Sequence, residues 1–451
     1  MSPLSHGPRA GGLVFGPMRT TAAPFPQPAC EADPGRSRLD HAGSGGGTAG
    51  MAPSVSHPPD GRVSFPHRET PATRTSLSTM ADTGTLLRTP LHAEHAALGA
   101  KLVPFAGYEM PVQYPSGITA EHHAVRNAAG LFDVSHMGEF TVRGERALDF
   151  VQHVSTNDAS KLEVGQAQYS TLLNHDGKLL DDLLVYRYPD HYMLVVNGAN
   201  KDKDWRWVSQ FAAPFGVDLQ DRTDDVALLA LQGPRAEAIL RRLTDADLDA
   251  IGYYRFAEGT VDGISATISR TGYTGEDGFE LYLPAADAAR LWRRLLEVGA
   301  DEGLLPAGLG CRDSLRLEMG YALYGNDLDE DTTPLEAGLG WVVKMDKPEF
   351  VGRDALARQK EQGIGRKLVG FRLKERGFPR HGYPVSVDGQ EAGVVTSGVL
   401  SPTLGEGVGM AYVPAAAAKP GTEIGVVIRN ATVPAEVVRP PFHKGGTVKN
   451  G

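Results

Sequence analysis

The feature that most constrains the fold is a series of six short runs, after about Gly352, in which apolar and polar residues alternate. The runs are residues 367–373, 383–387, 391–397, 408–413, 423–428 and 435–439, and turn residues such as Asp388-Gly389 and Arg429-Asn430 separate them. A period of two is typical of half-buried strands, and several short strands at this spacing indicate a small barrel or sandwich. We therefore expect residues 352–446 to form an all-β C-terminal domain.

The region before it, to about residue 347, is predicted to mix helices and strands. A helix is expected over residues 119–129, capped by Thr119 and stopped by Gly130, and an amphipathic helix over residues 288–298. Strands are expected at residues 169–173, 179–186 and 191–197, with the first two joined as a hairpin through Asp176-Gly177. Residues 311–318 have a helical period and are followed by Gly320.

The first 79 residues differ in composition from the rest. They hold 12 Pro, 11 Gly and 9 Ser, together with seven Arg, five acidic residues and no Lys. So few large apolar residues, placed without a period, do not offset the entropy lost on ordering the chain. We expect residues 1–79 to be a disordered, dispensable leader before a start near Met80, and an organelle transit peptide is the alternative.

Charge and cysteine content exclude several classes of protein. The chain has a net charge of −10 and no basic stripe, which argues against nucleic acid as its main partner. Its two cysteines, Cys30 and Cys311, suit neither a disulfide framework nor a zinc site, so a reducing compartment is expected. That compartment is the cytoplasm, or the mitochondrial matrix if the leader is a transit peptide. No apolar run approaches the roughly 18 residues of a membrane span.

Two further patterns are weak. Gly45, Gly47 and Gly50 match the spacing G-x-G-x-x-G, but neither a strand before them nor a helix after them is predicted, so we do not expect a dinucleotide site. The histidines at positions 122, 123 and 136 have no partner at metal-ligand spacing. We therefore expect surface or core histidines and no metal.

Two adjacent carboxylates interrupt the apolar run LLDDLLVY at residues 179–186. Because side chains alternate along a strand, Asp181 and Asp182 must face opposite sides. One could be solvated or capped on an outer face, while the other points toward the core or a cavity, where it needs a partner. The alternative is that both sit at a strand end near the turn at Gly177, where acidic residues are common.

Residues 271–280 (TGYTGEDGFE) are rich in glycine, which lets a backbone pass close to a flat ligand. Tyr273 and Phe279 could supply an aromatic wall. Glu276, Asp277 and Glu280 could accept hydrogen bonds from the paired N–H donors of a heterocycle. The alternative is a turn-rich loop with solvated acids.

Two arginines lie one helical turn apart in residues 311–318 (CRDSLRLE). On one face of a helix, Arg312 and Arg316 could bind a ligand that carries a carboxylate. They could equally form ion pairs on a solvated helix.

Taken together, six segments resemble, in order, the T-protein of the glycine cleavage system, a tetrahydrofolate-dependent aminomethyltransferase. They are PFAGYEMPVQY (104–114), GLFDVSHMGE (130–139), LLDDLLVY (179–186), TGYTGEDGFE (271–280), the segment that begins GCRDSLRLEMGYALYGNDLDED (310–344) and TSGVLSPTLG (396–405). The resemblance extends from about residue 89 to residue 442 and leaves out only the leader.

The resemblance implies an α+β fold with two intertwined mixed α/β folate-binding domains around a central channel, within residues 86–347, and a C-terminal antiparallel β-barrel. The implied reaction moves the aminomethyl carbon from the lipoyl arm of H-protein to tetrahydrofolate. Ammonia, 5,10-methylenetetrahydrofolate and dihydrolipoyl H-protein are the products. The implied partners are lipoylated H-protein and a small-molecule folate, with no nucleic acid and no membrane.

The resemblance also implies roles for single residues. The second carboxylate, Asp182, takes the main catalytic role, and Asp181 is the alternative. Glu280 is expected to accept from the ring N–H and the amino group of the pterin, and Arg312 to line the folate pocket. The residues expected near the pterin ring are Tyr169, Tyr273 and Met137, with Asn197 as a further candidate.

Lys178 departs from the family, in which a glycine is frequent at this position. It either places a cation near the two aspartates or points to water. Related proteins suggest two other functions: a folate-dependent demethylase acting on another one-carbon donor, or a non-catalytic folate-binding factor in iron–sulfur maturation. The second class carries a K-G-C-Y-x-G-Q-E-type segment, whereas this chain has GCRDS at residues 310–314, so the enzyme is favoured.

Overall fold

The computed structural model describes residues 85–448. The predictions for the leader, for a start at Met80, for the glycine pattern at Gly45 and for Cys30 lie outside these residues. Among the described residues no helix is both long enough and apolar enough to cross a membrane.

A six-stranded sheet is built from two separate parts of the chain. Its strands, in order across the sheet, are β10 (Phe256–Val261), β11 (Ile264–Ser269), β12 (Gly278–Pro284), β9 (Val226–Gln232), β3 (Ala129–Asp133) and β13 (Leu304–Pro306). Neighbouring strands are antiparallel except β13 and β3, which are parallel. Helices α5 (Ala236–Leu240) and α6 (Ala288–Gly299) cover one face, where Trp292 is fully buried in the core with Leu229 and Leu231.

The second sheet has five strands, all paired in antiparallel fashion. Their order is β5 (Gln166–Leu173), β6 (Leu179–Arg187), β7 (His191–Val196), β4 (Gly138–Arg143) and β8 (Asp218–Asp221). Helices α3 (Ala147–Val154) and α4 (Lys201–Phe215) add Phe150 and Val208 to the core on one face. On the other face, Tyr186 and Met193 share a core with Leu228 of the first sheet.

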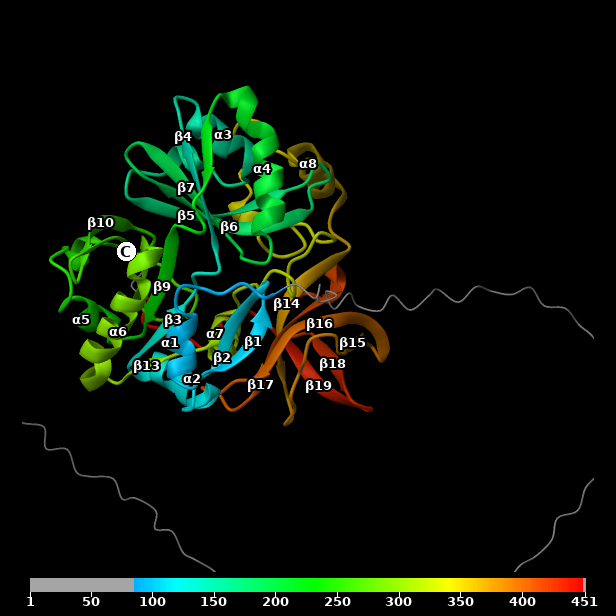
Figure 1. The fold of residues 1–451 in the computed structure, drawn as a ribbon. Coiled ribbons are helices and arrows are strands. Elements are labelled where there is room, and N and C mark those ends of the chain that lie inside the picture. Colours follow the sequence, from blue (N-terminus) through cyan, green and yellow to red (C-terminus); the bar gives the residue numbers. More distant parts are fainter. Residues whose placement is uncertain (1–84, 449–451) are drawn as a thin grey trace, which may run out of the picture. The chain divides into compact units, whose positions relative to one another are not determined.

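The connections between the sheets show why the two domains are intertwined. The chain completes β3 in the first sheet, builds β4 to β8 in the second and then returns to the first with β9. Figure 1 shows β4 and β7 beside α3 and α4 in one part of the molecule, and β3 and β9 beside α5 and α6 in another. The predicted fold of two intertwined α/β domains is confirmed.

The C-terminal strands form a closed antiparallel barrel, coloured orange to red in Figure 1. Around the barrel they are β14 (Arg366–Leu373), β17 (Gly407–Pro414), β16 (Gln390–Leu400), β15 (Pro384–Val387), β18 (Glu423–Ile428) and β19 (Ala431–Val438), and β19 pairs with β14 to close it. Phe371, Val395 and Val437 are buried inside. Each of the six predicted runs overlaps one of these strands, and the alternative of a sandwich is wrong because the sheet closes on itself.

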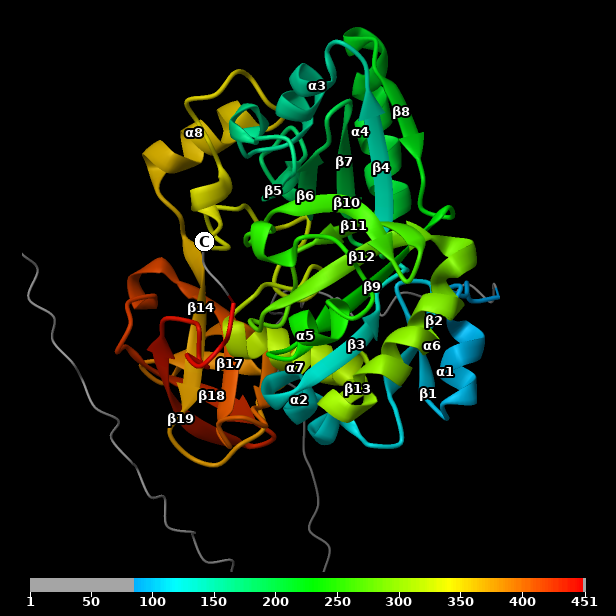
Figure 2. The ribbon, with the colours of Figure 1, turned by 90° about the vertical axis from the view of Figure 1, so that its left-hand side faces the viewer.

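Helix α7 (Leu309–Met319) connects the first sheet to the barrel. It contacts α2 (Ile118–Asn127), the second strand of the hairpin β1 (Lys101–Phe105)–β2 (Tyr108–Gln113), and the barrel strands β16 and β17. Figure 2 shows α7 between α2 and the barrel. Within the described residues, the remaining α-helices are α1 (His92–Ala97) and α8 (Arg353–Gln362).

The helix predicted over residues 119–129 has other bounds in the structure. Helix α2 begins after Gly117 and ends at Asn127, and Thr119 makes no capping hydrogen bond. Gly130 lies inside β3 and does not stop a helix. A Cβ at Gly130 would lie 2.4 Å from Cγ2 of Val125, so this glycine lets α2 pack closely on the strand that follows it. The predicted helices at residues 288–298 and 311–318 and the hairpin of β5 and β6 are confirmed.

Candidate functional site

A cavity of about 880 Å³ lies between the two sheets and the barrel. Strands β5, β6 and β7 form one wall, β9 and β12 a second, and β14, β17 and β19 a third. The loops at residues 320–324 and 337–341 add further lining residues. Among the residues that line it are Met137, Tyr169, Asp182, Asn197, Tyr273, Glu280 and Arg312. The structure thus brings together every residue to which the family resemblance gave a role, except Asp181.

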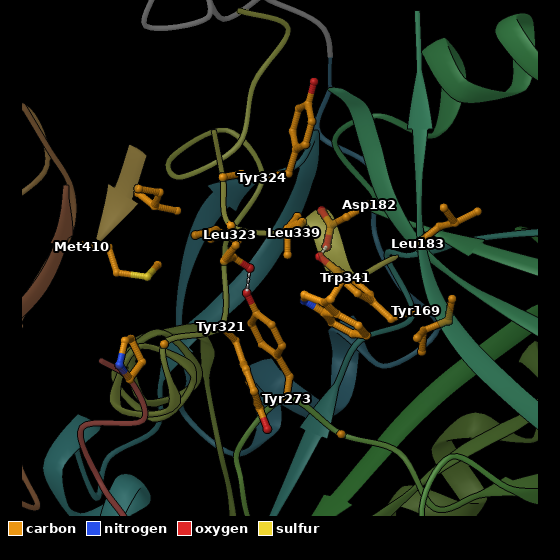
Figure 3. A pocket seen from close by; sticks show the side chains of 18 of the residues that line it. Tyr169, Asp182, Leu183, Tyr273, Tyr321, Leu323, Tyr324, Leu339, Trp341 and Met410 are labelled. Carbon is orange, nitrogen blue, oxygen red and sulfur yellow. Dashed lines mark hydrogen bonds between the residues drawn. The ribbon is translucent and has the colours of Figure 1, made fainter. Parts of the chain in front are cut away.

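The adjacent aspartates of β6 face opposite sides of the strand, as its alternation requires. Asp182 faces the cavity (Figure 3) and accepts a hydrogen bond from the hydroxyl of Tyr169 at 2.9 Å and from Nδ2 of Asn197 at 3.0 Å. Asp181 is fully buried on the other side and accepts from the backbone N–H of Asn197 at 2.9 Å. The suggestion of a solvated outer face is therefore wrong for Asp181, which is buried and hydrogen-bonded.

The surroundings of Asp182 favour its neutral form in the free protein. Burial raises the pKa of Asp182 above its ordinary value, and the charge of Asp181 raises it further. The hydrogen bonds from Tyr169 and Asn197 act in the opposite direction, because they stabilise the carboxylate. A cationic group that enters the cavity would favour the ionised form and be stabilised by it.

A second carboxyl group, that of Glu280, lies on the wall formed by β12. The hydroxyl of Thr271 donates to Oε2 of Glu280 at 2.5 Å, and Oε1 accepts no hydrogen bond from residues 85–448. Burial raises the pKa of Glu280, while Thr271 and the charge of Arg312 oppose the shift. Glu280 therefore offers one free acceptor oxygen to a ligand in the cavity.

The two arginines of α7 have different surroundings, although they lie one turn apart. The guanidinium of Arg312 faces the cavity, with its Cζ 4.7 Å from the centre of the Tyr273 ring, and it forms no ion pair with any described residue. Arg316 is withdrawn into the interior, where it pairs with Asp313 and Asp327 at 2.7 Å each. Of the two predicted alternatives, ligand binding suits Arg312 and ion pairing suits Arg316, which is buried and not solvated.

Two aromatic stacks border the cavity (Figure 3). The rings of Tyr169 and Trp341 lie 6.0 Å apart with an interplanar angle of 25°, and those of Tyr273 and Tyr321 lie 5.7 Å apart with an angle of 26°. The hydroxyl of Tyr273 donates to the backbone carbonyl of Ala322, which fixes the second stack. Trp341 is 61% exposed, so the first stack reaches solvent.

Sequence reasoning gave no role to Trp341, Tyr321, Tyr253, Tyr254 or Tyr324, all of which line the cavity. Three of them lie in the segment 310–344 that carries the family resemblance, and this was the available signal. Their loops are distant in sequence from the strands that they face, so no periodicity could have placed them there.

Three residues in or just before β12 do not line the cavity, contrary to the prediction that they contact a ligand. Phe279 is fully buried in the core of the first sheet. Glu276 pairs with Arg126 at 2.8 Å, and Asp277 pairs with Arg270 at 2.8 Å. Both acids are therefore buried partners of arginines, because an unpaired carboxylate is costly to bury.

Lys178 is not paired with either aspartate. Its Nζ donates to the backbone carbonyl of Asp331 at 2.8 Å. His122 and His136 are buried, and within residues 85–448 no three His, Cys, Asp or Glu side chains form a group that could hold a metal ion.

Both parts of the described chain match known protein families. Residues 91–347 match a domain described as "GCVT N-terminal domain", and residues 366–444 match one described as "Glycine cleavage T-protein C-terminal barrel domain". Two curated aminomethyltransferases are similar over most of their length. That of Halothermothrix orenii is 52% identical over 356 residues, which cover 79% of this chain and 99% of the relative. That of Rubrobacter xylanophilus is 55% identical over 364 residues, which cover 80% and 95%.

A solved structure has a similar fold. It is the crystal structure of the glycine cleavage system aminomethyltransferase T from Bartonella henselae, which is 37% identical to this chain with a TM-score of 0.76. The alignment covers 81% of this chain and 100% of that structure.

Proposed function

The chain belongs to the glycine cleavage T-protein family of aminomethyltransferases, and we propose that the cavity between its two sheets and the barrel is the site of one-carbon transfer. The observation that carries the proposal is the placement of Asp182, Glu280 and Arg312 on the walls of one cavity of about 880 Å³. A volume of this size suits a ligand of several rings. In this proposal the cavity binds tetrahydrofolate, and the lipoyl arm of H-protein brings the aminomethyl group to it.

Glu280 and the aromatic side chains bind and orient the pterin. The free Oε1 of Glu280 can accept a hydrogen bond from a ring N–H or amino group of the pterin. Oε2 can accept a second pterin donor in addition to the hydroxyl of Thr271. Arg312, which forms no ion pair with a described residue, supplies a positive charge beside Tyr273 for an anionic part of a substrate. Tyr273 and Tyr169 offer flat surfaces for stacking, and Met137 fills the wall beside them.

Asp182 acts on the carbon that is transferred. Loss of ammonia from an aminomethyl thioether builds positive charge on the one-carbon unit. Tetrahydrofolate supplies the nitrogen atoms that bond to this carbon. A fixed carboxylate stabilises this charge, and Tyr169 and Asn197 hold the carboxylate in one orientation. Because the charge grows as the transition state is approached, Asp182 contributes more to the rate than to the binding of the substrates.

The test is an assay with purified H-protein carrying the aminomethyl group on its lipoyl arm. With this donor and tetrahydrofolate, the chain should form 5,10-methylenetetrahydrofolate and ammonia in equal amounts, and Asp182→Asn should form far less. Methylated amines serve as alternative donors. If they supply the carbon while aminomethylated H-protein does not, the chain is a demethylase and the proposal is wrong.

We also propose a division of labour between the parts of the chain. Residues 86–347 contribute the polar side chains that handle the folate and the one-carbon unit. The barrel, within residues 352–446, closes the third wall with apolar groups such as Val369 and Met410 and adds two cationic side chains, Lys367 and Arg439.

A further inference from the structure

A third carboxyl group lies in the interior next to the two aspartates of β6. Asp204 belongs to α4 and, like Asp181, is fully buried. Neither oxygen of the Asp204 side chain accepts a hydrogen bond from any described residue. A buried carboxylate without donors is strongly disfavoured, and a neighbouring carboxylate disfavours it further.

Asp181, in contrast, is surrounded by N–H donors. It accepts from the backbone N–H of Asn197 at 2.9 Å, from Nδ2 of Asn197 at 2.9 Å and from Nδ2 of Asn200 at 2.7 Å. Nδ2 of Asn197 also lies 3.0 Å from Oδ1 of Asp182. One amide therefore connects the buried Asp181 with the carboxylate in the cavity.

The cation near these carboxyls, that of Lys203, opposes the rise in the pKa of Asp204 but forms no ion pair with it. Lys203, which precedes Asp204 on α4, donates instead to the hydroxyl of Tyr324 at 3.2 Å and to Glu330 at 2.9 Å. The other titratable groups near the aspartates are phenols, those of Tyr169, Tyr254, Tyr273 and Tyr324. Within residues 85–448 no ion pair includes Asp181, Asp182 or Asp204.

Asp181 and Asp204 avoid two adjacent buried negative charges when they share one proton. The proton belongs on Asp204, because three N–H donors stabilise the anion of Asp181 and none stabilises that of Asp204. Burial and the charge of Asp181 raise the pKa of Asp204 well above its ordinary value, in agreement with this placement. The O–H of Asp204 then gives Asp181 a fourth donor.

We propose that Asp204 is a positioning residue that donates a shared proton to Asp181, and that the pair fixes Asp182 through Asn197. This inference rests on the proposed function only in that Asp182 is taken as the catalytic carboxylate. The neutral Asp204 removes a third negative charge from the cluster, and the anionic Asp181 holds the Asn197 amide in the orientation that Asp182 requires. Removal of the donor from Asp204 would leave Asp181 to take up a proton itself and release the amide.

The proton can be detected without any substrate. Infrared spectra of the free wild-type chain at neutral pH should contain a carboxylic acid C=O band that shifts on ¹³C labelling of aspartate and is lost in Asp204→Asn. Glu139→Gln is the matched control. Glu139 is also buried without a hydrogen-bond partner, but it does not carry the aspartate label, so this variant should keep the label-sensitive band. A difference spectrum between wild type and Asp204→Asn that contains only carboxylate bands would overturn the proposal.

Kinetics test the positioning role. Asparagine can still donate to Asp181, so Asp204→Asn should keep kcat within about threefold, whereas Asp204→Ala should lower kcat by about 10- to 100-fold. Tetrahydrofolate affinity should change less than about twofold in both variants, because neither removes a group that lines the cavity. Thermal melting of each variant separates these effects from a loss of folded protein.

The pH dependence of kcat separates the proposal from a purely structural role. In Asp204→Ala, protonation of Asp181 lowers the opposing charge beside Asp182, so the acidic limb should move to lower pH. In Asp204→Asn the limb should stay in place. If Asp204→Asn moves the limb as far as Asp204→Ala does, Asp204 is an anion in the wild type and the proposal is wrong. If instead Asp182→Asn is fully active while the infrared band is present, the proposed function fails and the shared proton stands.

Discussion

Replacement of Glu280 by glutamine separates ligand binding from fold stability. The change keeps the size of the side chain and one carbonyl oxygen for the hydroxyl of Thr271. It removes the charge and replaces the second acceptor oxygen with an NH₂ group. That group would point its own hydrogens at the donors of the pterin, so tetrahydrofolate should bind more weakly.

The size of the effect follows from the contacts. A hydrogen bond to a charged group contributes about 1.5–3 kcal/mol, against about 0.5–1.5 kcal/mol for a neutral one, and a buried donor left unpaired costs about 1–3 kcal/mol. For a carboxylate that receives two pterin donors, we expect Glu280→Gln to weaken binding by about 2–4 kcal/mol, which is roughly 30- to 800-fold.

The pKa of Glu280 also determines how the affinity for tetrahydrofolate depends on pH. Burial raises the pKa of Glu280 in the free protein, and a ligand with N–H donors requires the ionised form. Binding therefore releases a proton, and the affinity of the wild type should rise with pH through the folded pKa of Glu280. Glu280→Gln has no such proton to release, so this part of the pH dependence should vanish.

Calorimetric titration with tetrahydrofolate in two buffers of different ionisation enthalpy measures both the affinity and the protons released. Glu276→Gln is the matched control, because Glu276 is buried near the same loop but pairs with Arg126 and does not line the cavity. It should lower the free energy of unfolding by about 3 kcal/mol, since Arg126 keeps its pair with Glu318, and leave the affinity nearly unchanged. Equal losses of affinity in both variants would refute the assignment of Glu280.

Three further predictions concern residues outside this loop. Asp182→Asn should lower kcat by about 100-fold or more with tetrahydrofolate affinity within about threefold, because the contact forms in the transition state. If kinetics instead show Asp181→Asn to be the severe variant and Asp182→Asn the mild one, the assigned face of β6 is wrong. Arg126→Met should destabilise the fold by about 3–5 kcal/mol in urea denaturation, since it removes the cation that pairs with two buried carboxylates, and a loss below about 1 kcal/mol would contradict this. Burial lowers the pKa of Lys347 to about 7, so above that pH the unfolded chain binds more protons than the folded one. Lys347 therefore makes the free energy of unfolding rise from about pH 7 to about pH 10, and Lys347→Met should show a smaller rise. An equal rise in the variant would contradict the prediction.

The elements that the sequence predicted well are those set by local patterns. Alternation identified the six barrel strands, and a run of apolar residues on each side of Gly177 identified the hairpin that carries Asp182. The helical period identified α6 and α7, and α7 also ends as predicted, because Gly320 adopts a left-handed conformation (φ +70°) after its last residue. In each case the information lies within a dozen residues.

The site could be predicted only in part, because its partners come from distant segments. Nothing near Glu276 indicates that Arg126, 150 residues earlier, will neutralise it. Phe279 and Glu280 are neighbours on β12, so their side chains face opposite sides of the sheet and only one of them can line the cavity. Asp181 also depends on Asn200, the residue just before α4, which donates to it from 19 residues later in the chain.

The insertion of one sheet within the other has a consequence for synthesis on the ribosome. Strand β3 emerges first, but its neighbours β9 and β13 follow roughly 90 and 170 residues later, which at about 5–20 residues per second is a delay of roughly 5–20 s for β9 and roughly 9–35 s for β13. During that interval β4 to β8 have all been made and can pair with one another. The residues of β3, all buried in the final fold, still lack the neighbouring strands β9 and β13. The order of translation therefore favours a nascent chain in which the inserted domain folds first and the domain that surrounds it folds last.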